Sequence, residues 1–376
     1  MKPLWKGPIE DGITNSLLSR WLVCPERFRL KVIEGKAEDE GFRPALEYGS
    51  LWHEAEEAFA MGQDWKKAVG RYRTKLRMRY PTDEAAINKW STLCLHQFPL
   101  YVNHWAGHRF TKQRKPILAE ESFRVPYKLP SGRTIVLRGK FDAVWTWSKS
   151  IKLQENKVKG ERSLDEEGIQ KTLGQNLQTM LYQIALREMV KGNGNLDGWE
   201  RGPFVSPANG RGPKPGWFFF KGDDKIWFPK MKVKGVIYNV IRRPLSDRHA
   251  IRQRKTETEK AFLLRERDRI EKDQSRWFMR WDARVDDTDV DEFKTRVFHP
   301  MLERFLDWAE WIAVDPFDPW TVKDERRSMR PGIHYQFPFG VYNGLAQGFR
   351  GDFFDYLTSG SRQGLEELDT LFPELV

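Results

Sequence analysis

The hydrophobic pattern of this chain has a helical period at its start and a strand period in its middle. Apolar residues recur at helical spacing in four N-terminal segments, which are residues 14–33, 44–61, 64–80 and 83–107. From Ile117 apolar and polar residues alternate, and this alternation predicts strands over 121–127 and 134–147. The pattern therefore predicts a mixed α/β protein.

Two of the strand-like runs carry informative polar residues. Asp142 lies on the run 138–147, and Glu155 and Lys157 lie on the run 151–158, after a short polar turn. Side chains alternate along a strand, so Glu155 and Lys157 point the same way, and in a hairpin Asp142 can reach that face. Two carboxylates and a lysine on one face suit a divalent-metal site for phosphodiester hydrolysis. The alternative is a hairpin whose charged side chains are only solvated.

Helical periodicity returns after this hairpin. Residues 164–192 are predicted to form one long helix that ends at Gly192 and carries Gln178 and Tyr182 four positions apart. The next segment, residues 195–216, is rich in Gly and Pro and predicts a loop. The remaining predicted elements are the last strands of the sheet at 217–220 and 235–241, and two helices at 249–275 and 289–313.

The second predicted helix contains a Gly-x-x-x-His spacing. Gly49 and His53 are four positions apart, so they share one face of that helix. A glycine there lets another backbone or a ligand approach, and the histidine one turn later can face the same gap. Taken alone, a helical histidine is more often a packed or surface residue than a ligand.

Composition and charge narrow the class of protein. Of the 376 residues 39% are hydrophobic, so the chain can bury a sizeable core. The formal net charge is +11, which favours a polyanionic partner such as nucleic acid. The two cysteines, Cys24 and Cys94, are too few for a disulfide framework. No stretch approaches the roughly 20 apolar residues of a membrane span, so we expect a soluble, cytoplasmic protein without a membrane partner.

The order of these features resembles the RecB-like branch of the PD-(D/E)XK nuclease superfamily. A helix with Gly-x-x-x-His precedes a strand with Gly139-x-x-Asp142, then Glu-x-Lys, then a helix with Gln-x-x-x-Tyr. Each motif is weak alone, but four in this order on the expected elements form a specific set. The resemblance covers roughly residues 14–244, including Cys24-Pro25-x-x-Phe28 near its start.

The resemblance implies a restriction-endonuclease-like core, in which helices flank a mixed central β-sheet, with helical N-terminal and C-terminal additions. The implied parts are a helical N-terminal region at residues 1–115, a nuclease core at 116–248, and a helical, aromatic-rich C-terminal region at 249–376 packed on the core.

The resemblance also implies a set of metal ligands. His53, Asp142 and Glu155 would bind the ion, joined by the backbone carbonyl of Asn156. A histidine nitrogen with two carboxylates suits Mg²⁺ or Mn²⁺ rather than structural zinc.

Further roles carry over from the same resemblance. Lys157 would orient or activate the attacking water and stabilise charge on the phosphate. Gln178 and Tyr182 would hold the substrate phosphate or support the site, and Glu121 matches a less regular acidic position upstream.

Some relatives bind an iron–sulfur cluster through the Cys-Pro cysteine and three cysteines near the C-terminus. Here Cys24 is present, but the segment 337–360 contains no cysteine. Four thiolates are the usual requirement, so we expect no iron–sulfur cluster, aromatic packing in its place, and Cys24 as a small buried residue.

These features favour a metal-dependent DNA nuclease, most specifically an exonuclease that processes DNA ends in recombination, repair or phage replication. A structure-specific or nicking endonuclease and a non-catalytic DNA-binding subunit are the alternatives, and the presence of Asp142, Glu155 and Lys157 argues against the latter. The chain has no Walker motif, so a helicase or annealing protein would be a separate chain. Aromatic residues flank the site, and some could stack an unpaired base, although core packing is their more common use: Trp52, Phe141, Trp145 and Tyr182.

Overall fold

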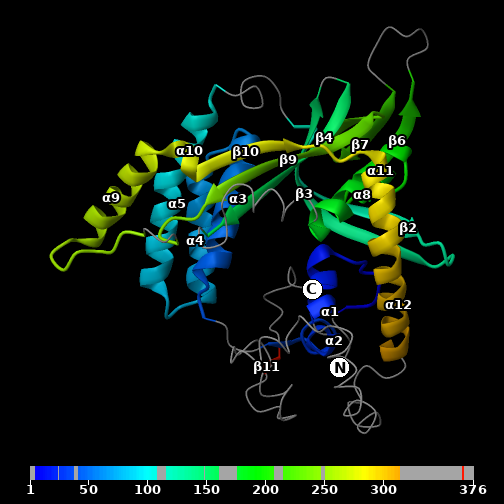
Figure 1. The fold of residues 1–376 in the computed structure, drawn as a ribbon, viewed down its shortest axis with the longest axis horizontal. Coiled ribbons are helices and arrows are strands. Elements are labelled where there is room, and N and C mark those ends of the chain that lie inside the picture. Colours follow the sequence, from blue (N-terminus) through cyan, green and yellow to red (C-terminus); the bar gives the residue numbers. More distant parts are fainter. Residues whose placement is uncertain are drawn as a thin grey trace. The chain divides into compact units, whose positions relative to one another are not determined.

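A six-stranded mixed sheet carries four of the predicted site residues, Asp142, Glu155, Asn156 and Lys157. The computed structural model describes residues 5–23, 25–37, 41–107, 116–147, 149–160, 176–206, 215–246, 250–313 and 366–367. The strand order of the sheet is β10-β9-β4-β3-β2-β5 (Figure 1). Its strands are β2 (Leu118–Lys128), β3 (Thr134–Trp147), β4 (Ser150–Lys159), β5 (Asn195–Leu196), β9 (Lys232–Arg242) and β10 (Phe278–Ala283).

The pairing of these strands confirms the predicted hairpin. β3 and β4 pair antiparallel, with Ala143 opposite Gln154. β4 and β9 pair in parallel, and β9 and β10 pair antiparallel. The first seven residues of β4, from Ser150 to Asn156, are all buried, because the sheet is covered on both faces at this strand. The predicted mixed α/β fold with a central sheet flanked by helices is therefore confirmed.

The described residues fall into two compact units. The first lies within Met1–Asp39, Arg124–Gly139 and Asp291–Val376, and the second within Glu40–Phe123 and Lys140–Val290. All of the predicted site residues belong to the second unit. The domain boundaries expected at residues 115 and 248 stay predictions.

Helices cover both faces of the sheet in the second unit. The helices of this unit are α3 (Pro44–Ala60), α4 (Trp65–Arg79), α5 (Glu84–Trp105), α8 (Leu177–Lys191), α9 (Glu259–Lys272) and α10 (Gln274–Trp277), of which α4 and α9 pack on other helices. On β4, Lys157 points toward Gln178 of α8, whereas Asn156 points toward Asn239 and the α3 side chain Glu56. Because neighbouring residues of a strand face opposite ways, α3 and α8 lie on opposite faces of β4.

Local sequence explains where these helices begin and end. The Asp64 side chain accepts hydrogen bonds from the first backbone amides of α4, and Asn176 does the same for α8. Gly192 ends α8 with a φ of +96°, a left-handed conformation that favours glycine. The structure describes the helix predicted over 164–192 from Leu177 onward, and residues 164–175 lie outside the described residues.

Aromatic contacts pack the helices that carry the site. Phe98 of α5 is fully buried, and its ring lies 5.2 Å from Trp52 of α3 and 4.8 Å from Trp65 of α4. This cluster joins three helices whose order in the chain matches the predicted N-terminal helical segments. Trp52 is therefore a core residue and cannot stack a base.

The first unit has its own aromatic cluster. Its elements are α1 (Asn15–Val23), α2 (Pro25–Phe28), η1 (Arg29–Ile33), β1 (Lys36–Ala37), η3 (Lys294–Phe298), α12 (His299–Ala313) and β11 (Glu366–Glu367). The residues of α11 (Asp287–Phe293) are divided between the two units at Asp291. Phe28 packs edge-on against Phe305 and Trp308 of α12. The first helical segment is interrupted at Pro25, since α1 ends at Val23 and α2 begins at Pro25. Cys24 and the segment 337–360 lie outside the described residues.

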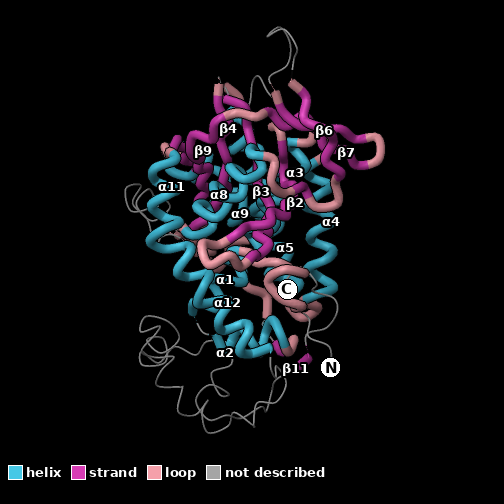
Figure 2. Tube along the Cα trace, turned by 90° about the vertical axis from the view of Figure 1, so that its right-hand side faces the viewer, coloured by secondary structure: helices cyan, strands magenta, loops and turns pink. Residues whose placement is uncertain are grey.

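A second, smaller sheet corrects two predictions. β6 (Glu200–Val205), β7 (Gly216–Lys221) and β8 (Asp224–Pro229) form an antiparallel three-stranded sheet (Figure 2). The run 217–220 therefore belongs to this sheet and not to the central one, and the predicted loop 195–216 contains β5 and β6. Gly202 and Pro203 are typical of loops, so the sequence predicts no strand at β6, although an edge strand tolerates both residues.

Two further corrections concern the chain after residue 248. The predicted helix 249–275 is shorter, since α9 begins at Glu259, and β10 was not predicted as a strand. Among the residues that the structure describes, no helix combines the length and hydropathy that a membrane span needs.

We expect Phe98→Ala to lower the free energy of unfolding by about 3–5 kcal/mol, because it empties the contact between three helices. Chemical denaturation measures this change. Met78→Ala, at a side chain of α4 that is 73% exposed, is the control and should change stability by less than about 0.5 kcal/mol. Equal effects of the two substitutions would contradict the packing described here.

Candidate active site

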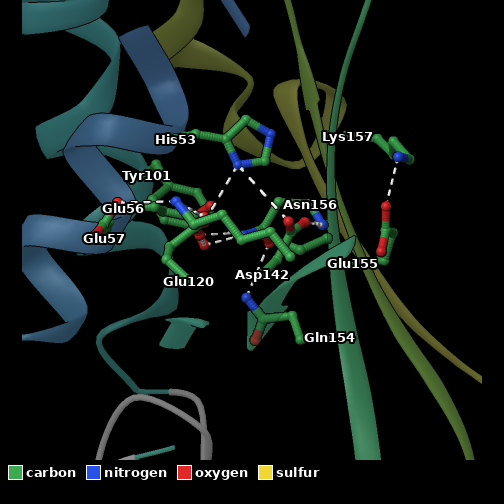
Figure 3. Close-up of polar contacts among 12 residues, drawn as sticks. His53, Glu56, Glu57, Tyr101, Glu120, Asp142, Gln154, Glu155, Asn156 and Lys157 are labelled. Atoms are coloured by element: carbon green, nitrogen blue, oxygen red, sulfur yellow. Dashed lines mark hydrogen bonds and ion pairs between the residues drawn. The ribbon is translucent and has the colours of Figure 1, made fainter. Parts of the chain in front are cut away.

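One histidine and two carboxylates from three different elements meet where α3 packs on the central sheet. His53 of α3 places its Nδ1 atom 3.5 Å from Oε1 of Glu120 and 4.0 Å from Oδ1 of Asp142. Glu120 lies on β2 and Asp142 on β3. Ligand atoms of these three residues, called the His53 cluster below, all lie within 4.8 Å of one another, which is close enough to hold a metal ion (Figure 3).

The acidic residue on β2 is Glu120 and not the neighbouring Glu121 suggested by the sequence. Glu120 has a φ of +54°, which is uncommon for a residue with a side chain and marks an irregularity in the strand. The side chain of Glu121 instead accepts a hydrogen bond of 3.0 Å from Nε1 of Trp199. Two adjacent acids in the sequence carried no signal that separates these roles, because simple alternation does not hold at a positive φ.

Glu155 lies across β4 from the His53 cluster, together with Lys157 (Figure 3). Its Oε1 atom lies 2.5 Å from Nζ of Lys157, which also donates to Oε1 of Gln178 at 2.7 Å. The other oxygen, Oε2, is buried and accepts no hydrogen bond from any described residue. The predicted pairing of Glu155 with Lys157 on one face is thus present, but the structure does not gather Glu155 into the His53 cluster.

Asp142 is held by the backbone of the next strand. Its Oδ2 atom accepts a 2.6 Å hydrogen bond from the backbone amide of Asn156. This contact fixes the orientation of the carboxylate at the point where β3 and β4 lie side by side. The use of the Asn156 carbonyl as a metal ligand stays a prediction.

A buried polar network supports the contact between Asp142 and Asn156. The Asn156 side chain accepts from Asn239 at 3.0 Å, and Asn239 also donates to Glu56 at 3.0 Å. Tyr101 of α5 donates to the same Glu56 oxygen at 2.6 Å. These contacts connect β4, β9, α3 and α5, so the strand that carries Glu155 and the helix that carries His53 are positioned by one network.

The electrostatics of the cluster are dominated by burial and by neighbouring carboxylates. Burial works to lower the pKa of His53, but Asp142 and Glu120 outweigh it and raise the pKa to about 9. Burial, and then the charge of Glu155, raise the pKa of Asp142 well above its usual range. Burial works to raise the pKa of Glu120, yet His53 and Lys140 lower it overall.

The surroundings of the cluster are partly open and partly packed. His53 is 35% exposed, and a β-carbon added at Gly49 would meet no described atom within 4 Å. No backbone therefore approaches Gly49 among the described residues, and the space beside it is available to a ligand. Phe141 and Tyr182 are buried and pack against each other at 5.7 Å, so they serve as core residues.

The chemistry of these side chains fits a hard divalent cation. The His53 cluster offers one imidazole nitrogen and the carboxylates of Glu120 and Asp142, which suits Mg²⁺ or Mn²⁺, and Glu155 adds a carboxylate across β4. The buried and unpartnered Oε2 of Glu155 is the kind of atom that a cation would satisfy. A positive ion here would also relieve the repulsion between Asp142 and Glu155.

A mixed sheet between helices, with clustered carboxylates and a lysine on adjoining strands, defines the class of α/β phosphodiesterases that use divalent metals. The family model of the PD-(D/E)XK nuclease superfamily matches residues 13–262, which is more than half of the chain. The chain therefore belongs to the PD-(D/E)XK nuclease superfamily. A search of curated proteins found no match.

Membership in this superfamily implies a nuclease that hydrolyses phosphodiester bonds of nucleic acid and uses a divalent metal ion. The family match does not distinguish branches of the superfamily, so the RecB-like branch expected from the sequence stays a prediction.

We expect Glu120→Gln to weaken Mn²⁺ binding by about tenfold or more, because it removes a charged ligand of the His53 cluster. Titration calorimetry on the metal-free protein measures this affinity. The matched control is Glu121→Gln, which keeps an acceptor for Trp199 and should leave Mn²⁺ affinity unchanged. A larger effect at Glu121 would instead support Glu121 as the acidic site residue, as the sequence predicts.

We also expect Mn²⁺ affinity to rise with pH between about 6 and 8.5. A metal ion requires the neutral imidazole, and the raised pKa of His53, about 9, means that binding must expel a proton throughout this range. Each expelled proton strengthens binding about tenfold per pH unit. Calorimetry in two buffers of different ionisation enthalpy counts the protons. In His53→Gln the affinity should be lower and one fewer proton should be released; an unchanged proton count would exclude His53 as a ligand.

Proposed function

We propose that this chain is an Mg²⁺- or Mn²⁺-dependent deoxyribonuclease that acts as an exonuclease on DNA ends. The observation that carries the proposal is the meeting of His53, Glu120 and Asp142 within 4.8 Å, with Glu155 and Lys157 on the adjoining strand, in a chain of this superfamily. These residues supply the ligands and the cation that phosphodiester hydrolysis needs.

In this proposal His53, Glu120 and Asp142 hold the metal ion, with Glu155 as the further ligand that the sequence predicts, and the backbone amide of Asn156 keeps Asp142 in place. When bound, the ion supplies a Lewis acid to a phosphate oxygen and lowers the pKa of a water. His53 takes part as the neutral imidazole, after loss of the proton that Asp142 and Glu120 favour in the free protein.

Lys157 contributes the positive charge beside the carboxylates. Its side chain is 17% exposed, and its ammonium group is held between Oε1 of Glu155 and Oε1 of Gln178. In this position it can orient the attacking water and stabilise the charge that develops on the phosphate. Gln178 positions Lys157, and Tyr182 supports the site by packing against Phe141, next to Asp142.

The charge of α4 supports a nucleic acid substrate. This helix carries seven basic and no acidic residues, and three of its exposed cations, Lys67, Arg71 and Lys75, repeat at every fourth position. Like charges at that spacing destabilise a helix. Contacts to the phosphate backbone of DNA would offset this cost and give binding that weakens steeply with salt.

The exonuclease assignment rests on the expectation that helices preceding the sheet guide a strand past the metal, which needs a free end. We propose roles in recombination, repair or phage replication, a cytoplasmic location, and a separate helicase or annealing protein as the motor. The retention of Asp142, Glu155 and Lys157 favours an enzyme over a non-catalytic DNA-binding subunit.

We expect the full chain with Mg²⁺ or Mn²⁺ to degrade linear single-stranded DNA to short products and to leave a covalently closed single-stranded circle intact. EDTA should abolish the reaction, and excess metal should restore it. End-labelled and circular substrates are compared at matched protein, metal and salt, with product sizes read on gels.

The control for this experiment is Asp142→Ala, which should lower turnover by orders of magnitude while DNA binding through the basic surface persists. Cleavage of the circle as fast as the linear strand would replace the exonuclease with an endonuclease. Undiminished cleavage in EDTA would contradict the metal-dependent mechanism itself.

A further inference from the structure

The three-stranded sheet β6-β7-β8 has one buried face and one open aromatic face. Trp217, Phe219 and Phe228 are at most 8% exposed and lie on the buried face. On the other face, Phe218 of β7 lies opposite Trp227 of β8, and Phe220 lies opposite Lys225. These four side chains are called the aromatic face below. The three rings are half-buried, and the lysine is exposed.

The rings of the aromatic face lie directly against the strand backbone. A β-carbon added at Gly216 would come within 2.9 Å of Cζ2 of Trp227, and one added at Gly202 within 2.7 Å of Cε2 of Phe220. Both rings thus lie over glycines, where any other residue would push them away. A ring held against the backbone on one side presents its other side outward.

A lysine lies over these rings. Nζ of Lys225 is 3.7 Å from the ring centre of Phe218 and 5.4 Å from that of Phe220. The rings of Phe218 and Trp227 are neighbours, with centres 4.6 Å apart. The Lys225 side chain thus covers the outer side of the Phe218 ring; because it is exposed and flexible, it can move aside for a base, and it places a positive charge beside a stacking surface.

We propose that the aromatic face binds single-stranded nucleic acid, with bases stacked on Phe218 and Trp227 and a phosphate paired with Lys225. Stacked bases on aromatic rings with a cation for the backbone are the recurring means by which proteins bind unpaired strands. This inference rests on the proposed function for the identity of the ligand. It adds a binding site separate from the residues that hold the metal.

The substrate class of the superfamily favours this ligand over an apolar partner. The charges beside the rings are mixed: Lys221 and Lys225 are positive, and Asp223 and Asp224 between them are negative. Glu200 of β6 lies opposite Phe220 and is an acidic residue at the border of the aromatic face. A nucleic acid strand would therefore be attracted at Lys225 and repelled at Glu200. The aromatic residues first considered for stacking, such as Trp52 and Phe141, are fully buried and unavailable.

The test measures binding without cleavage. The full chain carrying Asp142→Ala is titrated in EDTA with a fluorescein-labelled oligothymidylate of about 16 nucleotides and with a duplex of the same length, and fluorescence anisotropy gives Kd. We expect Phe218→Ala with Trp227→Ala to raise Kd for the single strand by about tenfold or more and to change Kd for the duplex far less. Phe218→Trp with Trp227→Phe keeps both rings and should restore binding.

Exposed charges provide variants that leave the packing intact. Lys225→Glu should weaken single-strand binding, and Glu200→Gln should strengthen it. Lys67→Glu with Lys75→Glu on α4 is the comparison, because loss of general phosphate contacts should weaken single strand and duplex alike.

Three outcomes would overturn the inference. One is an unchanged single-strand Kd in both the alanine pair and Lys225→Glu; another is an equal loss for single strand and duplex. A third is unchanged binding with a dimer converted to a monomer in sedimentation, which would assign the face to a second copy of the chain. Because no cleavage is needed, these outcomes are read even if the unmutated protein fails to cut DNA, which would instead refute the proposed function.

Discussion

The burial of several carboxylates beside very few cations is the constraint on which the site depends. Asp142 and Glu155 repel each other, and burial in the sheet makes each negative charge more costly. His53 of α3 and Lys140, which contacts Glu120, limit this cost on one side of β4, and Lys157, held by Gln178 of α8, limits it on the other. The site therefore needs both covering helices, since α3 carries His53 and α8 carries the side chain that holds Lys157. A divalent ion would complete it, which connects the stability of the site to its proposed chemistry.

The residues behind the site explain how such an arrangement keeps its geometry. Asn156 is fixed twice, by its backbone amide to Asp142 and by its side chain to Asn239. From there Glu56 and Tyr101 continue the contacts into α3 and α5, so the helix of His53 and the strand of Glu155 cannot shift independently. Buried polar groups that are nearly all hydrogen-bonded specify one arrangement, whereas apolar packing alone tolerates several. Among the described residues, Oε2 of Glu56 and Oε2 of Glu155 are buried without a hydrogen-bond partner.

The aromatic residues of the second unit divide into two groups with different uses. Trp52, Phe98 and Tyr101 pack three helices together and are buried. The rings on β7 and β8 instead lie over glycines on the open face of a small sheet. Composition counts both groups equally, although only the second can meet a ligand. The proposed path of a strand would then use phosphate contacts at α4 and stacking at the small sheet, two kinds of contact that respond differently to salt and to base pairing.

The sequence by itself determined the local structure and much of the chemistry. Helix caps, the Gly192 stop and the β3–β4 hairpin follow from local residues, and motif spacing pointed to His53, Asp142, Glu155 and Lys157. Sequence could not separate Glu120 from Glu121, because alternation along a strand breaks where one residue takes a positive φ. It also could not decide that Glu155 lies across β4 from the His53 cluster, or that β7 pairs with β6 and β8 rather than with the central sheet. Those outcomes depend on pairing and packing between residues far apart in the chain, which only the tertiary structure decides.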